Sequence, residues 1–271
     1  MVSETRPGSG GESMRERLAA RAPEWRLIRG WSADEVFERL RELPYRPSTA
    51  PDPEDEEARD GTSTGWRHYF SEASVAREAP GPPVEDGAFE RARRLVERYT
   101  FSDPRIVQAH FDAEAPLLGR PMLLEIKVLG IHYLCGVVVG AVHEEAALRE
   151  SVFEFRYDTL LGHLEAGSEW FSLKKDHETG SVDFRIRATW RPGQFPNWWS
   201  RLGFEWLARR YQRAWHRLAY VRLRAALGHN DLTPLPRRRD LLRKGRPLPQ
   251  PRIASLASPI PPSGFSVEVQ E

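Results

Sequence analysis

The sequence predicts an α+β fold in which an antiparallel sheet folds around one long helix near the carboxyl terminus. Six segments in the middle of the chain have apolar patterns typical of strands: 106–111, 122–129, 131–142, 152–157, 169–175 and 182–190. After Arg191 and Pro192 the pattern becomes helical and continues from about 197 to 227, which corresponds to roughly 45 Å of helix. Because a run of strands precedes the helix, we expect the helix to pack against the sheet.

Two shorter helices are expected before the strands. Ser32 and Glu35 form a capping box, in which each side chain satisfies a free backbone N–H at the start of a helix. Asp86 or Gly87 begins the second helix. The apolar faces of these helices are expected to carry Val36, Phe37 and Leu40 in the first, and Phe89, Ala92, Leu95 and Val96 in the second.

The last predicted strand shows the clearest alternation. Apolar residues at 182, 184, 186, 188 and 190 alternate with polar residues at 183, 185, 187 and 189, which indicates a sheet with one wet face. Gly180 marks a hairpin turn before it. In the long helix, Trp199, Leu202 and Trp206 form an apolar stripe, and five of the nine tryptophans lie between 190 and 215.

The ends of the chain differ from its middle. We expect an extension with a short helix at 1–24, one folded domain at 25–228 with an acidic loop at 44–65, and a tail at 229–271. The tail holds eight of the 22 prolines and many arginines, so we expect it to be largely disordered. Its basic stretch from Arg237 to Arg252 is a candidate surface for an anionic partner.

Composition excludes several classes of function. With 40 basic and 39 acidic residues among 271, the chain has no overall charge that favours nucleic acid, and we expect no specific nucleic-acid partner. A single cysteine, Cys135, excludes a disulfide framework and a cysteine-rich zinc module. Phosphate-binding loops and nucleophile elbows are missing from the sequence, and no apolar run is long enough to span a bilayer. We therefore expect a cytoplasmic protein with no cofactor or metal, and the sequence names no protein partner.

The densest cluster of chemically specific residues lies at 157–171, with the sequence YDTLLGHLEAGSEWF. It resembles the pattern Tyr-Gly-Thr-Leu-Pro-Gly-His-Pro-Glu-x-Gly-Glu-Glu-x-Phe of a bacterial and plant family, domain-of-unknown-function family nineteen-ninety. The matching positions are Tyr157, Thr159, Leu160, Gly162, His163, Glu165, Gly167, Glu169 and Phe171, whereas Asp158, Leu161, Leu164 and Ser168 depart from it. A downstream Arg191-Pro192 and Gln212 in the long helix are similar to the family as well.

This resemblance covers about residues 45–227 and suggests a divergent member. The family is similar to the START and Bet v 1-like (SRPBCC) superfamily. The resemblance therefore implies a helix-grip fold, in which a curved antiparallel sheet wraps around a long C-terminal helix. It implies no particular activity.

Two interpretations of the motif remain open. His163, Glu165 and Glu169 are candidate catalytic residues, because an imidazole and carboxylates suit general acid–base chemistry or zinc binding. No second histidine at metal-ligand spacing accompanies them, so the favoured interpretation is that His163 and Glu165 hold a tight loop through hydrogen bonds to backbone.

Aromatic residues supply the leading functional hypothesis. If the space between sheet and helix is not filled, these side chains would line an apolar pocket for a small molecule. The candidate ligand-binding residues are Phe155, Tyr157, Trp170, Phe184, Trp190, Trp199 and Trp206. The leading prediction is thus a non-enzymatic module that binds an apolar small molecule or lipid. The alternatives are a filled core, an enzyme using His163 with Glu165 or Glu169, and an interaction protein acting through the basic tail.

Overall fold

The strands of the chain pair mainly with their neighbours in sequence. The computed structural model describes residues 23–51, 65–229, 232, 234–236 and 241–244. These residues form one nine-stranded antiparallel sheet in the order β3-β4-β5-β6-β7-β8-β2-β9, with β1 paired to the start of β5. The strands are β1 (Glu24–Leu27), β2 (Arg67–Arg77), β3 (Val107–His110), β4 (Pro121–Val128), β5 (Ile131–Ala146), β6 (Glu150–Thr159), β7 (Glu165–Asp176), β8 (Ser181–Pro192) and β9 (Arg243–Lys244).

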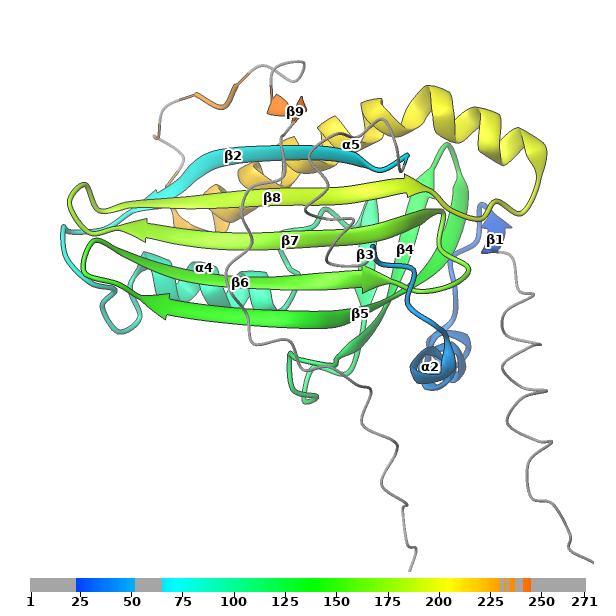
Figure 1. The fold of residues 1–271 in the computed structure, drawn as a ribbon, viewed down its shortest axis with the longest axis horizontal. Coiled ribbons are helices and arrows are strands. Elements are labelled where there is room, and N and C mark those ends of the chain that lie inside the picture. Colours follow the sequence, from blue (N-terminus) through cyan, green and yellow to red (C-terminus); the bar gives the residue numbers. More distant parts are fainter. Residues whose placement is uncertain (1–22, 52–64, 230–231, 233, 237–240, 245–271) are drawn as a thin grey trace, which may run out of the picture.

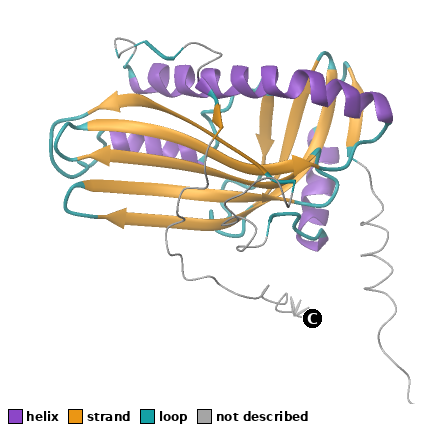
Figure 2. Ribbon diagram, turned by 45° about the horizontal axis from the view of Figure 1, so that its top comes forward, coloured by secondary structure: helices purple, strands orange, loops and turns teal. Residues whose placement is uncertain are grey.

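The helix-grip arrangement predicted from the sequence is confirmed. The long helix α5 (Trp198–Leu227) and the shorter α4 (Ala88–Glu97) lie on the same side of the curved sheet (Figures 1 and 2). The main core lies between them and the sheet, with contributions from β2 and from β4 to β8. All six predicted strands are present, and alternation in β8 matches its burial, since residues 182, 184, 186, 188 and 190 are buried.

The sequence pattern did not predict three of the strands, β1, β2 and β9, and a physical reason explains each omission. β2 places Ser71, a buried polar residue, on its inner face, so its sequence lacks the regular apolar alternation of a strand. β1 and β9 contain four and two residues, too few to show a period. Residue 24, assigned above to an extension, begins β1.

The prediction of a disordered tail is wrong for residues 241–244. Leu241 is 2% exposed, and β9 pairs with Tyr69 and Phe70 of β2. A leucine that reaches the core and a free strand edge are enough to hold this short segment. The predicted helix near residues 14–21, residues 52–64 of the acidic loop, and 245–271 with much of the basic stretch lie outside the described residues. The domain boundaries stay a prediction.

The helix α2 (Ala33–Glu42) begins at the predicted capping box. The Glu35 backbone N–H donates to Ser32 Oγ at 3.3 Å, and the Ser32 N–H donates to Glu35 Oε2 at 2.9 Å. Val36 and Leu40 pack against Leu123 and other residues of a second, smaller core. Phe37, predicted to share that apolar face, is instead exposed, because this short helix buries only a narrow stripe. A 3-10 turn, η1 (Leu43–Tyr45), follows it.

The two halves of α5 have different surroundings. Its C-terminal half packs into the main core through Trp215, Ala219, Tyr220, Leu223 and Leu227. In its N-terminal half, Leu202 is 58% exposed and Trp206 is 89% exposed. The predicted apolar stripe therefore does not face the sheet at these two positions. Helical periodicity gives the spacing of a stripe but not which part of a helix has a partner.

A buried polar network ties the C-terminal half of α5 to the sheet. Ser71 Oγ of β2 lies 2.6 Å from His216 Nδ1 and 2.5 Å from the Tyr220 hydroxyl. Burial lowers the pKa of His216 to about 3, so the imidazole is neutral. Since these groups satisfy one another away from water, they fix the register of α5 on β2.

No helix in the part of the chain that the structure describes has the length and apolar character needed to cross a membrane.

The difference between the two halves of α5 predicts contrasting effects of the same substitution. Leu223→Ala should lower the free energy of unfolding by about 2–5 kcal/mol, because Leu223 is 1% exposed and its removal leaves a cavity. Leu202→Ala in the exposed half is the matched control and should change it by less than about 1 kcal/mol. Urea denaturation followed by circular dichroism measures both. Equal losses would show that the N-terminal half packs as tightly as the C-terminal half.

Candidate functional site

The motif at 157–171 forms the end of β6, a tight connection and the start of β7. Gly162 adopts a positive φ of 92°, and the His163 N–H donates to the Leu160 carbonyl at 3.0 Å, which closes the turn. Thr159 Oγ1 joins the two strands: it accepts from the Gly167 N–H at 2.8 Å and donates to the Gly167 carbonyl at 3.0 Å. A Cβ on Gly167 would lie 2.1 Å from the Thr189 carbonyl oxygen, so no other residue fits there.

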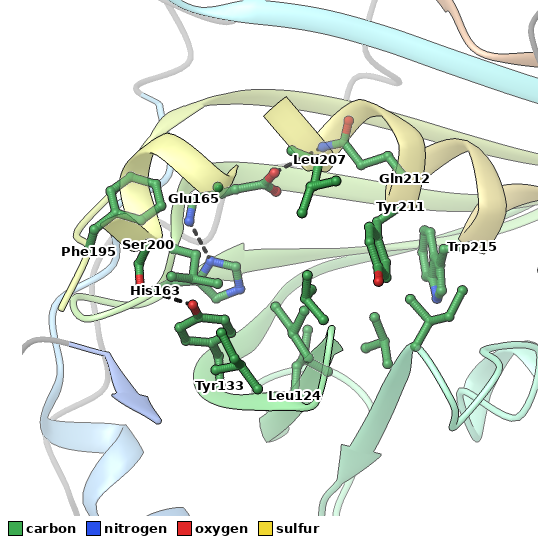
Figure 3. A pocket seen from close by; sticks show the side chains of 18 of the residues that line it. Leu124, Tyr133, His163, Glu165, Phe195, Ser200, Leu207, Tyr211, Gln212 and Trp215 are labelled. Carbon is green, nitrogen blue, oxygen red and sulfur yellow. Dashed lines mark hydrogen bonds between the residues drawn. The ribbon is translucent and has the colours of Figure 1, made fainter. Parts of the chain in front are cut away.

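A cavity of about 310 Å³ lies beside this connection, beneath the N-terminal half of α5 (Figure 3). Its walls come from α5, from β2, β3, β4 and β5, from the motif, and from loop residues that include Tyr99 and Phe195. Most of the lining side chains are apolar or aromatic. They are Tyr69, Tyr99, Ile106, Val107, Leu124, Ile126, Val128, Leu129, Ile131, Tyr133, Tyr157, His163, Leu164, Glu165, Glu169, Phe195, Trp199, Ser200, Gly203, Leu207, Ala208, Tyr211, Gln212 and Trp215.

His163 is held on the wall of this cavity by its own loop. The backbone N–H of Glu165 donates to His163 Nδ1 at 2.9 Å, and the Gln194 N–H donates to the His163 carbonyl at 3.1 Å. Burial lowers the pKa of His163 to about 4, so the ring is neutral at physiological pH. The loop-holding interpretation thus has a structural basis for His163, while the side chain of Glu165 reaches α5 instead.

Glu165 and Glu169 lie on the same face of β7, because residues four apart on a strand point the same way. Glu165 accepts a hydrogen bond from Gln212 Nε2 of α5 at 2.9 Å. Glu169 accepts from the hydroxyls of Tyr157 and Tyr69, the latter at 3.4 Å. Burial raises the pKa of Glu165 to about 7 and that of Glu169 to about 8. Near neutral pH the cavity therefore holds carboxyl groups poised between their acid and ionised forms.

The structure brings together the three candidate catalytic residues but only some of the candidate ligand-binding residues. His163, Glu165, Glu169, Tyr157 and Trp199 line the cavity. The others lie elsewhere: Phe155 and Phe184 are in the filled core, Trp170 stacks with Arg156 and Arg187, Trp190 packs against Tyr69, and Trp206 is exposed to solvent.

Sequence reasoning missed several polar lining residues. Tyr69 lies on the strand that was not predicted, and Tyr99 follows α4. On α5, Ser200 hydrogen-bonds to the hydroxyl of Tyr133 at 3.0 Å. The small or polar residues Ser200, Gly203, Ala208, Tyr211 and Gln212 recur at helical spacing beside the tryptophan stripe, together with Leu207. That second stripe was the available signal for the cavity face.

Nothing in the described ranges suggests a metal centre. No group of three or more His, Cys, Asp or Glu side chains among the residues that the structure describes could hold a metal ion. Cys135 is buried, and burial raises the pKa of its thiol to about 12, so it is unreactive.

Comparison with models of protein families matches residues 51–222 to Domain of unknown function (DUF1990). The chain belongs to the DUF1990 family. The match includes the whole motif and the cavity-lining part of α5. A search of curated proteins found no match to this DUF1990 protein.

Similar solved structures include Ara h 8.0201, at 13% identity and a TM-score of 0.37, over 61% of this chain and 100% of that one. They include ginseng major latex-like protein 151 from Panax ginseng, at 14% identity and a TM-score of 0.33, over 61% of this chain and 98% of that one. Zhui aromatase/cyclase from Streptomyces sp. R1128 has 16% identity and a TM-score of 0.33, over 60% of this chain and 92% of that one.

The two buried carboxyls predict a loss of stability at alkaline pH. Their pKa values in the folded protein lie above the ordinary value of 4.5, so above pH 4.5 the folded chain keeps protons that the unfolded chain has released. The free energy of unfolding should therefore fall as pH rises toward 8. Burial lowers the pKa of His163 to about 4 and that of His216 to about 3, so both rings are already neutral in the folded protein. In the unfolded chain they lose their protons around pH 6.5, which opposes the fall only below about pH 7.5.

Glu169→Gln should reduce this decline by about 2 kcal/mol between pH 6.5 and 8.5, because glutamine does not titrate. Its carbonyl oxygen accepts from one tyrosine hydroxyl and its amide N–H donates to the other. Denaturation at both pH values measures the difference. Glu178→Gln, at an exposed turn position, is the control and should keep the wild-type slope. An unchanged slope in Glu169→Gln would show that this carboxyl is ionised in the folded protein throughout.

Proposed function

We propose that this DUF1990 protein binds an apolar small molecule in the cavity beneath the N-terminal half of α5. The observation that carries the proposal is the cavity itself, with about 310 Å³ of space and mostly apolar walls. Pockets for small molecules begin near this size and have the same character, an apolar lining with a few placed polar groups.

An unfilled apolar cavity lowers the stability of a protein, because its lining side chains lose the contacts that a filled core would give. Two large apolar side chains of the same half of α5, Leu202 and Trp206, are exposed to solvent and do not line the cavity. A ligand would supply the missing contacts. This arrangement favours a binding site over an imperfect core.

Side-chain contacts between described residues join the N-terminal half of α5 to the rest of the fold at three places. Trp199 packs edge-on against Trp25 with ring centroids 5.4 Å apart, Ser200 bonds to Tyr133, and Gln212 bonds to Glu165. The C-terminal half is fixed in the core. We therefore assign the N-terminal half the role of a lid, which admits a ligand when these contacts break.

Glu165 and Glu169 also support a second candidate function, an enzyme of the same fold. Carboxyls with pKa values of about 7 and 8 inside an apolar cavity suit general acid–base catalysis near neutral pH. Glu165→Gln and Glu169→Gln separate the two functions. If the protein is a binding module, either variant should bind the ligand and leave it chemically unchanged, as the wild type does. If it is an enzyme, the wild type should convert the bound molecule and the variants should bind it without converting it.

Filling the cavity tests the binding function directly. Ala208 lines the cavity, so Ala208→Trp should weaken binding of the neutral fluorescent probe N-phenyl-1-naphthylamine at least about 10-fold, or about 1.4 kcal/mol. Arg209→Trp adds the same side chain at the next, exposed position and should leave binding unchanged. Fluorescence titration of the full-length chain measures both. Equal affinity in the two variants would place the probe outside this cavity.

Native mass spectrometry of the freshly purified protein provides a second test. An apolar adduct that is absent from the denatured mass, and absent from Ala208→Trp, would support the proposal. An adduct of the same mass on both proteins would argue that the molecule binds elsewhere.

A further inference from the structure

We propose that the ligand of this cavity carries a neutral carbonyl-type oxygen, which accepts a hydrogen bond from Nε2 of His163. The inference rests on the proposed binding function and names the chemical class of the ligand. It follows from which ring nitrogen of His163 carries the hydrogen, from the burial of Nε2, and from the charges of the residues that line the cavity.

The position of the hydrogen follows from the loop geometry. A backbone N–H can only donate, and the N–H of Glu165 points at His163 Nδ1 from 2.9 Å. Nδ1 must therefore be the unprotonated acceptor nitrogen of the ring. In a neutral imidazole the hydrogen then resides on Nε2, which becomes a donor.

No acceptor among the described residues pairs with this donor. His163 is 5% exposed, and its Nε2 is buried with no hydrogen-bond partner among the described residues. Figure 3 shows the ring on the cavity wall, with the nitrogen that is not bonded to Glu165 directed toward the space between Tyr133 and Tyr211. Buried donors in folded proteins are nearly always satisfied, so a donor left free beside an apolar cavity indicates an acceptor that enters with the ligand.

The charge of the lining selects a neutral acceptor. No arginine or lysine is among the described residues that line the cavity, whereas Glu165 and Glu169 both are. A carboxylate or phosphate on the ligand would meet buried acidic groups with no cation to offset the loss of hydration. A ketone, aldehyde, ester or amide oxygen accepts the hydrogen bond without that cost. The inferred ligand is therefore an apolar molecule with an uncharged carbonyl group.

A pair of probes matched in shape tests this inference. 9-Fluorenone and fluorene are planar molecules that differ in a carbonyl against a methylene group, and each can be titrated as a competitor of N-phenyl-1-naphthylamine. The quantity to compare is the ratio of the two dissociation constants. The substitution His163→Phe should shift this ratio about 10-fold toward fluorene, because phenylalanine keeps an aromatic ring at this position but has no N–H to donate to the ketone.

Control variants keep the result interpretable. His143→Phe changes a histidine that does not line the cavity and should leave the ratio at the wild-type value. His163→Gln, which retains an N–H donor, should recover part of the preference for the ketone. A ratio that is the same in wild type and His163→Phe would overturn the inference, and the binding function would still stand. If the probe binds but neither compound displaces it, this inference fails and the binding function stands. If the probe does not bind in the cavity, both proposals fail.

A measurement on the wild-type protein avoids reliance on a variant that does not fold. The carbonyl carbon of 13C-labelled 9-fluorenone should shift downfield on binding, as expected for a hydrogen-bonded carbonyl. In 15N-histidine-labelled protein, His163 should show a protonated Nε2 whose resonance moves when the ketone binds and not when fluorene binds. A carbonyl resonance unchanged from that in an apolar solvent would overturn the inference.

Discussion

The fold of this protein depends on the packing of one long helix against a sheet that can bury only part of it. The 30 residues of α5 extend along the sheet, and Trp215, Tyr220 and Leu223 anchor its C-terminal half in the core. Because a helix is stiff, anchoring one half sets the closed position of the other half above β3, β4 and β5. The space beneath that half is the cavity, so the cavity follows from how the helix is held.

The motif connects this architecture to chemistry. Thr159 and Gly167 hold the ends of β6 and β7 together, and the turn at Gly162 brings His163 to the cavity wall. Glu165 then accepts a hydrogen bond from Gln212 on α5, so the same short segment forms part of the cavity wall and contacts the helix above it. The residues that resemble a catalytic set in sequence thus form part of the cavity wall, and Nε2 of His163 has no hydrogen-bond partner among the described residues.

The sequence predicted most of the fold because the strands from β3 to β8 carry their own apolar patterns. β8 is the clearest case, since every second residue from Val182 to Trp190 is buried. β2 was missed because Ser71 is satisfied by His216 and Tyr220, residues about 150 positions away that no local pattern reveals. The cavity was anticipated as a possibility, but its lining was not, because tryptophan spacing cannot distinguish Trp199 at the cavity from Trp206 in solvent. Whether a tryptophan of α5 lines the cavity or faces solvent depends on which part of the helix packs on the sheet, and helical spacing does not show this.

The short strand β9 gives the carboxyl-terminal region a part in the site. It pairs with the backbone of Tyr69 and Phe70, on a strand that would otherwise be an edge of the sheet. The hydroxyl of Tyr69 in turn donates to Glu169 in the cavity. Residues 243–244, which the sequence places in a tail outside the folded domain, therefore support the strand that carries Tyr69 in the cavity wall. Shortening the chain before residue 241 would remove support from a residue that contacts the buried acid, as well as uncover a strand able to pair with another molecule.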